Sequence, residues 1–388
     1  MIKISEKINK CRISNDHNLI DLFDFGEISL TGVFPIKKKQ NIKKTPLSVA
    51  FSKKSKLLQL KHNYNFKNLF GKNYGYRSGL NKSMVEHLKK KYTYLNEKIS
   101  LNESDIILDI GSNDGTFLSF FNKNFKLYAC DPTIKKFRKY YRKDIKLIPD
   151  FFSADKFNNL KFNLITSIAM FYDLPDPLKF ANDIKSVLTD NGIWHVEMSY
   201  MPSMLNNSSY DTICHEHLEY YSLKSLKYLM DLADLKIINI SFNQINGGSI
   251  SLDISKKNSK YSENKILLKW LLLREELYGV NNLDYQKKFF ENCKKQKFIF
   301  KNLLQKLKSQ GKSIYGYGAS TKGNVILQYS GINKNYLDCI IEVNSFKFNR
   351  FTPGTYIKIL SEKHIKKKRP DYLLVLPWHF KDHIIKKE

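Results

Sequence analysis

The stretch IILDIGSNDG at residues 106–115 decides the fold of this chain. Its first half is an apolar strand that contains Asp109, and a turn with Gly111 and Gly115 follows. Asp131 stands directly after a second apolar run, 126–130. In a doubly wound sheet the carboxyl ends of parallel strands open onto a crevice, where glycines let a ligand approach the backbone and an acid binds ribose hydroxyls. The pattern therefore predicts an α/β sheet that holds a nucleoside.

Strand and helix patterns alternate after residue 104. The predicted strands are 106–110, 126–130, 145–148, 163–169, 192–198, 235–240 and 249–254, with helices between them such as 176–188 and 223–233. Seven strands with a short final pair favour the methyltransferase variant of the doubly wound sheet. A dinucleotide site would more often show G-x-G-x-x-G after its first strand. The turn instead carries Asp114, which would repel a pyrophosphate but suits the cationic sulfonium and amino groups of S-adenosylmethionine.

Length and composition set limits on the class of protein. A chain of 388 residues with 42% hydrophobic residues predicts two or three domains with real cores. No stretch is long and apolar enough to span a membrane, and residues 1–10 lack the apolar core of a signal peptide. The five cysteines, at 11, 130, 214, 293 and 339, lie too far apart for a disulfide scaffold. A reducing cytoplasm fits this pattern.

The formal net charge of +28 raises the question of a polyanionic partner. Binding to nucleic acid is one interpretation. The lysines are spread over the whole chain rather than gathered in a patch, which indicates a general compositional bias. We therefore expect no specific nucleic-acid or membrane partner, and a positive field that favours an anionic small substrate.

The N-terminal region consists of short strand-like pieces at 19–25, 46–51 and 56–60. CRIS at 11–14 and SKKS at 52–55 have the spacing of zinc knuckles, but Cys11 is the only thiol among them. Structural zinc needs four thiolate or imidazole ligands, so we expect no metal. Further on, Tyr74, Tyr76 and Arg77 precede an amphipathic helix. They could pack in a core or form a lid over a polar ligand, and the sequence does not decide between the two.

The C-terminal third predicts a second, smaller α/β unit after two connecting helices, 261–278 and 283–307. One strand pattern runs into the turn Gly316-Tyr317-Gly318, a second ends at Glu342, and a third spans 372–376. Ser320, Thr321 and Lys322 open a helix after the glycine turn, and a helix N-terminus with a lysine is an anion cradle. The alternative is that the glycines only pack helix against strand.

The segment YDTICHEHLEYYS at 210–222 has two histidines and two glutamates within five residues. Because it leaves the carboxyl end of the sheet, it should face the cofactor crevice. A metal site is one interpretation, although an i, i+2 histidine pair diverges on a helix. A solvated loop is another. General acid–base chemistry is favoured, since a histidine beside a carboxylate can remove a proton next to a carbonyl.

Several motifs in one order resemble the sugar C-methyltransferases that act on nucleotide-linked 4-keto deoxyhexoses. They are YRSG at 76–79, DIGSNDG at 109–115, DFFS at 150–153, CHEH at 214–217, NGGS at 246–249 and GYGASTKGN at 316–324. The resemblance implies a small β-rich domain with a degenerate zinc site (1–72), a class I methyltransferase domain (73–258) and a connector with a Rossmann-like domain (259–388). It also implies deprotonation beside a keto group by His217, with the enolate attacking the methyl of S-adenosylmethionine.

The resemblance assigns three sets of residues. Catalytic roles are expected for His217, Glu216, Tyr76 and His215. Cofactor binding is expected for Asp109, Gly111, Ser112, Asp114, Gly115, Asp131, Pro132, Asp150, Phe151 and Met170. Substrate binding is expected for Tyr74, Asp173, Cys214, Asn246, Gly247, Gly248, Ser320, Thr321 and Lys322.

The chain also departs from the family pattern. Ser14, Ser52 and Ser55 stand where the family has zinc cysteines, Cys214 replaces a tyrosine, and Asp173 replaces a histidine. These departures leave methylation of a hydroxyl as an alternative, and a nicotinamide-dependent oxidoreductase using the 316–318 turn as a weaker one. A monomer is compatible with the sequence.

Overall fold

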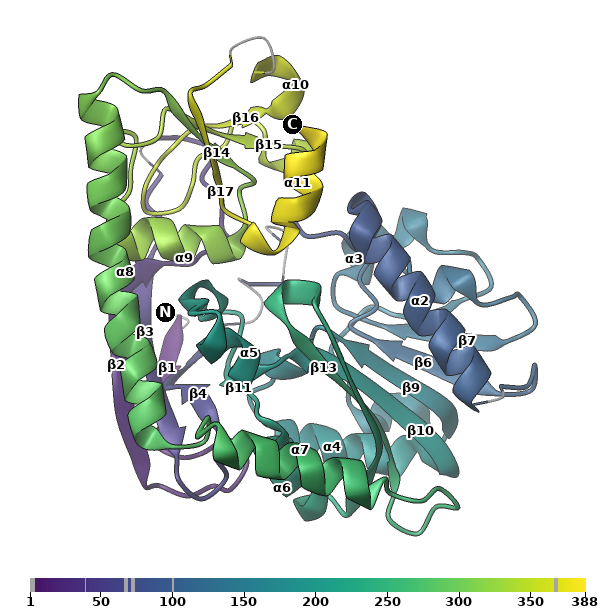
Figure 1. Ribbon diagram of the computed structural model, residues 1–388. Helices are drawn as coiled ribbons and strands as arrows, with labels where there is room; N and C mark the ends of the chain where they lie inside the picture. Colours follow the sequence, from purple (N-terminus) through teal and green to yellow (C-terminus); the bar gives the residue numbers. More distant parts are fainter. Residues whose placement is uncertain (1–3, 39, 66–68, 71–73, 100, 366–368) are drawn as a thin grey trace.

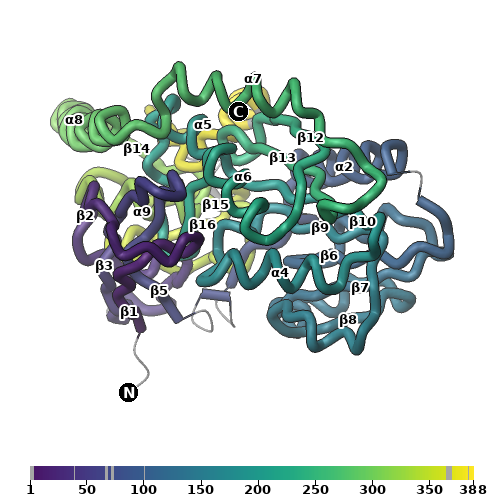
Figure 2. The backbone as a smooth tube through the Cα atoms, turned by 90° about the horizontal axis from the view of Figure 1, so that it is seen from below, coloured from purple at the N-terminus to yellow at the C-terminus, as the bar shows by residue number. Residues whose placement is uncertain are grey.

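The computed structural model describes residues 4–38, 40–65, 69–70, 74–99, 101–365 and 369–388. Three larger sheets carry the described chain, and the N-terminal strands lie at the opposite end of the molecule from β7 and β8 (Figures 1 and 2). The predicted domain boundary at 72/73 falls outside the described residues. No described helix is long and apolar enough to cross a bilayer.

The central sheet has seven strands in the order β12-β13-β10-β9-β6-β7-β8. Its members are β6 (Ile106–Ile110), β7 (Lys126–Cys130), β8 (Lys146–Ile148), β9 (Phe162–Ile168), β10 (Leu188–Ser199), β12 (Leu235–Asn243) and β13 (Ser249–Lys256). β13 pairs antiparallel with both β10 and β12, and the remaining pairs are parallel. This is the doubly wound class I methyltransferase sheet that the alternation predicted, with β13 running opposite to both of its neighbours.

Side chains alternate between the two faces of this sheet, and each face has its own helical cover. Ile107 packs with Met84 and Leu88 of α2 (Lys82–Ile99) on one face. Leu108 belongs to the core on the other face, beneath α4, α6 and α7 (Figure 1). The helices of the described chain are α2, α3 (Ile134–Phe137), α4 (Pro177–Val187), α5 (Met201–Asn206), α6 (Leu223–Leu232), α7 (Lys265–Leu277), α8 (Leu283–Ser309), α9 (Thr321–Ser330), α10 (Glu362–Ile365) and α11 (Lys381–Lys387).

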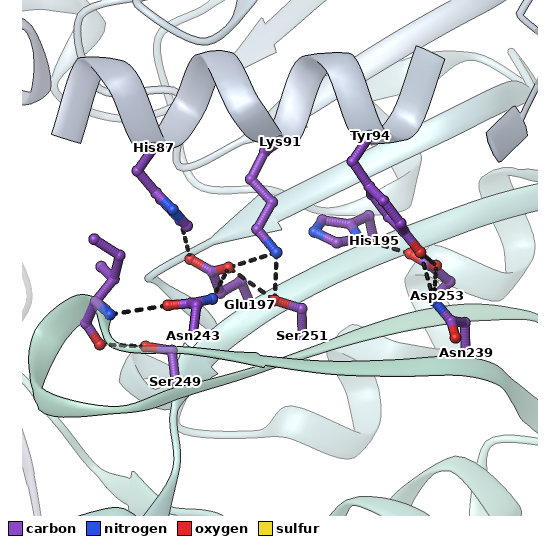
Figure 3. A network of polar contacts seen from close by, with 11 residues as sticks. His87, Lys91, Tyr94, His195, Glu197, Asn239, Asn243, Ser249, Ser251 and Asp253 are labelled. Atoms are coloured by element: carbon purple, nitrogen blue, oxygen red, sulfur yellow. Dashed lines mark hydrogen bonds and ion pairs between the residues drawn. The ribbon is translucent and has the colours of Figure 1, made fainter. Parts of the chain in front are cut away.

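α2 is also fixed to the sheet by buried charges (Figure 3). Glu197 of β10 is 2% exposed and lies 2.6 Å from His87 Nε2 and 2.7 Å from Lys91 Nζ. Ser251 and Asn243 donate further hydrogen bonds to the same carboxylate. Four groups thus contact the Glu197 carboxylate, one at Oε1 and three at Oε2, which offsets much of the cost of burying a charge.

The N-terminal strands form an antiparallel sheet in the order β11-β4-β3-β2. Its strands are β2 (Leu19–Ser29), β3 (Lys44–Ser52), β4 (Leu58–Leu60) and β11 (Glu219–Tyr220), and β1 (Ser5–Lys7) pairs with β5 (His62–Tyr64) beside it. β11 comes from the segment that follows His217, so the N-terminal sheet anchors that segment directly.

The degenerate zinc knuckles come together in this region. Cys11 Sγ lies 3.0 Å from Ser55 Oγ, the Ser14 N–H lies 3.5 Å from the same sulfur, and the Ser55 N–H donates to Ser52 Oγ. Cys11, Ser52 and Ser55 are almost completely buried. Hydrogen bonds therefore link the two knuckles.

The C-terminal sheet is parallel, with the order β16-β15-β14-β17. Its strands are β14 (Ile314–Tyr317), β15 (Cys339–Glu342), β16 (Ile359–Ser361) and β17 (Tyr372–Val375). The sequence did not indicate β16, which is only three residues long. The long α8 runs from the N-terminal sheet to this unit and packs against β2 and α9 (Figure 1).

Candidate active site

A cavity of about 670 Å³ lies at the carboxyl ends of β6, β7 and β9. The segment before α2, the loop before β11, the start of α9 and η9 (Trp378–Phe380) complete its wall. The cavity is therefore lined by residues of the central sheet and of the C-terminal unit. Its volume lies in the range of small-molecule pockets.

The glycine turn after β6 forms one end of the cavity. Gly111 has φ +74°, and a Cβ there would lie 2.8 Å from Met170 Cγ, so only glycine fits. Of the expected cofactor residues, Asp109, Gly111, Ser112, Asp131, Pro132, Asp150, Phe151 and Met170 line the cavity.

Asp131 holds this turn in shape. One carboxylate oxygen accepts the N–H of Asn113 at 2.9 Å, and the other accepts the N–H of Thr133 at 2.6 Å. Asp109 accepts from Thr166 Oγ1 at 2.6 Å, and burial raises the pKa of Asp109 to about 7. A carboxylate at the end of β7 beside an open glycine turn fits the ribose of an adenosyl cofactor, and the cavity leaves room for it.

Asp114, which was expected to face the cofactor, is not among the residues that line the cavity. Its carboxylate accepts the N–H of Gly79 at 3.0 Å and pairs with Arg77 at 3.4 Å. Gly115 is also absent from the lining, and a Cβ there would strike the Tyr141 ring at 2.6 Å. Both residues instead fix the segment before α2 and the Tyr141 ring against the glycine turn.

His217 lies in the wall opposite the glycine turn. Its Nδ1 is 2.8 Å from the carbonyl oxygen of Thr212, and a carbonyl only accepts, so Nδ1 carries the proton. Nε2 is then an unprotonated acceptor. Burial, reinforced by the Lys322 cation, lowers the pKa of His217 to about 3. The imidazole is therefore neutral at physiological pH and able to take a proton.

Glu216 lines the cavity beside His217. The Thr31 hydroxyl donates to its Oε2 at 3.3 Å, and burial raises its pKa. Gly32 makes room for it, since a Cβ at that position would lie 2.5 Å from Oε1. Cys214 and Asp173 are cavity residues as well.

Matches to known proteins agree with this arrangement. Residues 81–240 match a methyltransferase domain family, and residues 244–388 match the C-methyltransferase C-terminal domain. The C-methyltransferase NovU of Streptomyces niveus is 26% identical over 396 residues, covering 100% of this chain and 94% of NovU. The chain is thus similar to a C-methyltransferase along its whole length. It is an S-adenosylmethionine-dependent methyltransferase.

Solved structures with similar folds cover less than half of this chain. An S-adenosylmethionine-dependent methyltransferase from Clostridium acetobutylicum has a TM-score of 0.36 and 13% identity, covering 44% of this chain and 92% of that one. A 1,6-didemethyltoxoflavin-N1-methyltransferase from Burkholderia thailandensis, bound to S-adenosylhomocysteine, has a TM-score of 0.35 and 11% identity, covering 46% and 83%.

His215, for which a catalytic role was expected, is not among the residues that line the cavity. The side chain is completely buried and packs edge-on against Tyr64, with ring centroids 4.8 Å apart. Burial lowers the pKa of His215 to about 3. His215 and His217 therefore point to opposite sides of the loop. The described residues contain no cluster of three or more His, Cys, Asp or Glu suited to a metal.

The acceptor end of the cavity is formed by the C-terminal unit. Ser320, Thr321 and Lys322 line it, and Lys322 Nζ donates to the carbonyl of Asn246 at 3.2 Å. Gly247 and Gly248 do not line it, contrary to expectation, because they let Trp378 and Ser203 approach the backbone. The glycines of the 316–323 turn likewise pack against apolar side chains, chiefly Ile340, Pro377 and Leu376.

Two basic residues of the cavity were not indicated by the sequence. Lys347 lines it and donates to the carbonyl of Ala319 at 2.8 Å. His379 also lines it, and burial, with Lys322 nearby, lowers its pKa to about 3. Neither stands in a recognisable motif, although His379 directly follows the strand and the Pro377-Trp378 pair that the sequence did reveal.

Tyr74 and Tyr76 both line the cavity, so the segment before α2 forms wall rather than core. The backbone of this segment is tied to the glycine turn, because the Ser78 N–H donates to Asn113 Oδ1 at 2.9 Å. Tyr76 is 44% exposed, so it lines the cavity where the cavity wall also meets solvent.

Proposed function

We propose that this enzyme transfers the methyl group of S-adenosylmethionine to a carbon beside the keto group of a nucleotide-linked deoxysugar. One observation carries the proposal: His217, with Nε2 unprotonated, lies in the same cavity as the glycine turn and the Lys322 helix terminus. A base between a cofactor end and an anion-binding end is what such a reaction requires.

Each part of the cavity has a task in this mechanism. S-adenosylmethionine supplies an electrophilic methyl group when it is bound at the Gly111 turn. The start of α9, with Lys322 and Lys347, holds the diphosphate of the substrate by charge and by helix N–H groups. His217 Nε2 removes the proton from the sugar carbon, and the electron pair left behind forms the new carbon–carbon bond. In the proposed division into 1–72, 73–258 and 259–388, the Gly111 turn and His217 belong to the second domain, and Lys322 and Lys347 to the third.

The diphosphate would also raise the basicity of His217. Lys322 contributes to the lowered pKa of the imidazole. An anion that neutralises this cation removes that contribution, so the pKa of His217 rises toward the range of a useful general base. Substrate binding thus activates the base.

The five described cysteines are all buried and free, in keeping with a reducing cytoplasm.

Purified protein, incubated with methyl-labelled S-adenosylmethionine and a panel of dTDP- and GDP-linked 4-keto-6-deoxyhexoses, tests the proposal. We expect label in a product whose new methyl resists mild acid and shows a carbon–methyl coupling by NMR. An oxygen-linked methyl would instead establish the O-methyltransferase alternative. No labelled product from any acceptor, with S-adenosylhomocysteine still bound by the protein, would overturn both.

A further inference from the structure

Asp173 occupies an unusual place in the cavity wall. It ends the short helix η5 (Phe171–Asp173), just after β9, and its N–H donates to the Met170 carbonyl at 3.1 Å. The side chain lines the same cavity as His217 and Tyr76. Its Oδ1 is shielded from solvent and has no hydrogen-bond partner among the described residues. A shielded carboxyl oxygen without a partner at a ligand cavity points to a contact made by the ligand.

Among the described residues, the charged groups that act on Asp173 are acidic: Glu216, from the loop before β11, and Glu219, in β11. Asp173 acts in turn on Tyr74, Tyr172 and Cys214. Glu219 has its own cation, Arg12, at 3.5 Å. Lys322 acts on Asp211, Cys214, His217 and His379. Burial, and then the charge of Glu216, hold the pKa of Asp173 well above its ordinary value.

Glu216 cannot easily move away from this arrangement. The Thr31 hydroxyl holds Oε2, and the missing side chain of Gly32 leaves the space that Oε1 fills. Two carboxyl groups held in one low-dielectric cavity, with no cation shared between them in the described part of the chain, do not both ionise, so the pair keeps a proton. An ionised carboxylate only accepts hydrogen bonds, whereas a protonated carboxyl group donates one.

We propose that Asp173, kept protonated beside Glu216, donates a hydrogen bond to the keto oxygen of the substrate. The inference rests on the proposed function above. His217 Nε2 takes the proton as the carbon–hydrogen bond breaks, and the electron pair moves toward the keto oxygen, where Asp173 meets the growing charge. When the pair returns to form the carbon–methyl bond, the methyl–sulfur bond breaks with its electrons on sulfur. The oxygen becomes a carbonyl again, and Asp173 keeps its proton throughout.

Comparing Asp173→Asn with Asp173→Ala shows whether Asp173 acts as a neutral hydrogen-bond donor or as an ionised carboxylate. An amide donates a hydrogen bond without charge, so Asp173→Asn should keep kcat within about tenfold of the parent, while Asp173→Ala should lose about 10²–10³-fold. In the parent, kcat/KM should fall on the alkaline side as Asp173 ionises, and this fall should be absent in Asp173→Asn. Glu216→Gln removes a negative neighbour, so it should move the alkaline fall to lower pH.

The protonation of Asp173 is also measured without turnover. The infrared difference between the parent and Asp173→Asn at neutral pH should contain the carbonyl stretch of a protonated carboxylic acid, and Asp190→Asn, at an exposed site, should not produce it. An ionised-carboxylate difference instead would overturn the proposal, as would an Asp173→Asn variant that is folded, binds cofactor and is as inactive as Asp173→Ala. Failure of the parent on every keto-sugar would overturn the proposed function, while the infrared result still decides the state of Asp173.

Discussion

The Nδ1–H of His217 is directed at the carbonyl oxygen of Thr212, 2.8 Å away. That one hydrogen bond fixes the tautomer of the imidazole and leaves Nε2 as the unprotonated nitrogen. It comes from within the same loop, so the base is oriented by the chain that carries it rather than by a separate carboxylate. This geometry makes His217 the residue on which methyl transfer should depend most.

Replacing His217 by asparagine should lower kcat by about 10²–10⁴-fold, because no other side chain takes its place as base. Affinity for S-adenosylhomocysteine, measured by titration calorimetry, should stay within twofold. His17→Asn, at an exposed histidine, serves as the control. If the kcat of His217→Asn stayed within tenfold of the parent value, a group other than His217 would have to remove the proton from the sugar carbon.

Lys322→Met should weaken binding of the methyl acceptor and leave binding of the cofactor unchanged. Loss of one charge-assisted contact to a diphosphate should raise the acceptor KM about 10–100-fold and leave the KM for S-adenosylmethionine unchanged. Lys322 contributes to the lowered pKa of His217, so its removal raises that pKa. The acid limb of kcat/KM should therefore move to higher pH. Lys334→Met, at an exposed site, should change neither quantity.

Asp131→Asn should weaken cofactor binding by about tenfold or more, which calorimetry with S-adenosylhomocysteine would measure. The two carboxylate oxygens each accept a backbone N–H, from Asn113 and Thr133. An amide offers one acceptor and turns a donor toward the other N–H, leaving it unpaired. Asp190→Asn is again the matched control. Unchanged affinity would remove Asp131 from the cofactor site.

Glu197→Gln should lower the free energy of unfolding by about 3–5 kcal/mol, because His87 and Lys91 are left without their buried partner. Burial alone would raise the pKa of Glu197, but the hydrogen bond from His87 and the charge of Lys91 hold it far below its usual range. A depressed folded pKa stabilises the protein above the unfolded value, about 4.3, and this contribution fades as the pH falls below it.

Urea denaturation at pH 7 and at successively lower pH would measure both effects. The difference between the parent and Glu197→Gln should be largest near neutral pH and shrink in acid. Glu97→Gln, on the exposed side of α2, is the control and should stay within about 0.5 kcal/mol of the parent. A Glu197→Gln protein as stable as the parent would show that the network in Figure 3 adds nothing net.

Ser14→Cys, Ser52→Cys and Ser55→Cys together should create a zinc site. These positions surround Cys11, whose sulfur contacts Ser55 and the Ser14 backbone. Four thiolates at two knuckles bind zinc tetrahedrally. Metal analysis should find one equivalent of Zn²⁺, and a chelator should lower the Tm of the variant but not of the parent. The same triple variant with Cys11→Ser should bind zinc far more weakly; equal uptake would locate the metal elsewhere.

Local patterns in the sequence predicted the parts of the fold that depend on neighbouring residues. The bounds of β6 and β7 were predicted to the residue, since an apolar run followed by a glycine or acidic turn leaves little choice. The two-residue β11 was not predicted, because its pairing with β4 joins positions about 160 residues apart and has no local pattern.

For the site as well, the sequence predicted the residues that stand in local motifs but not the contacts with residues far along the chain. Gly111, Asp131 and His217 stand at the ends of regular elements or in a dense polar motif, and the structure places all three in the cavity wall. The orientation of Asp114 and of His215 depends on partners far along the chain, Arg77 and Tyr64, which no spacing reveals. The domain boundaries and the individual roles of the residues in the wall stay predictions.

Because β11 pairs with β4, the N-terminal sheet holds the loop that carries His217 in place. His217 lies two residues before a strand whose only described sheet neighbour is β4. A fragment that keeps the central and C-terminal sheets but lacks β2–β4 would retain the Gly111 turn and release the base-bearing loop. Such a fragment should still bind the methyl donor, but the His217 side chain would no longer be held in position. Misfolding of the first sixty residues should therefore lower the rate of methyl transfer without abolishing binding of the methyl donor.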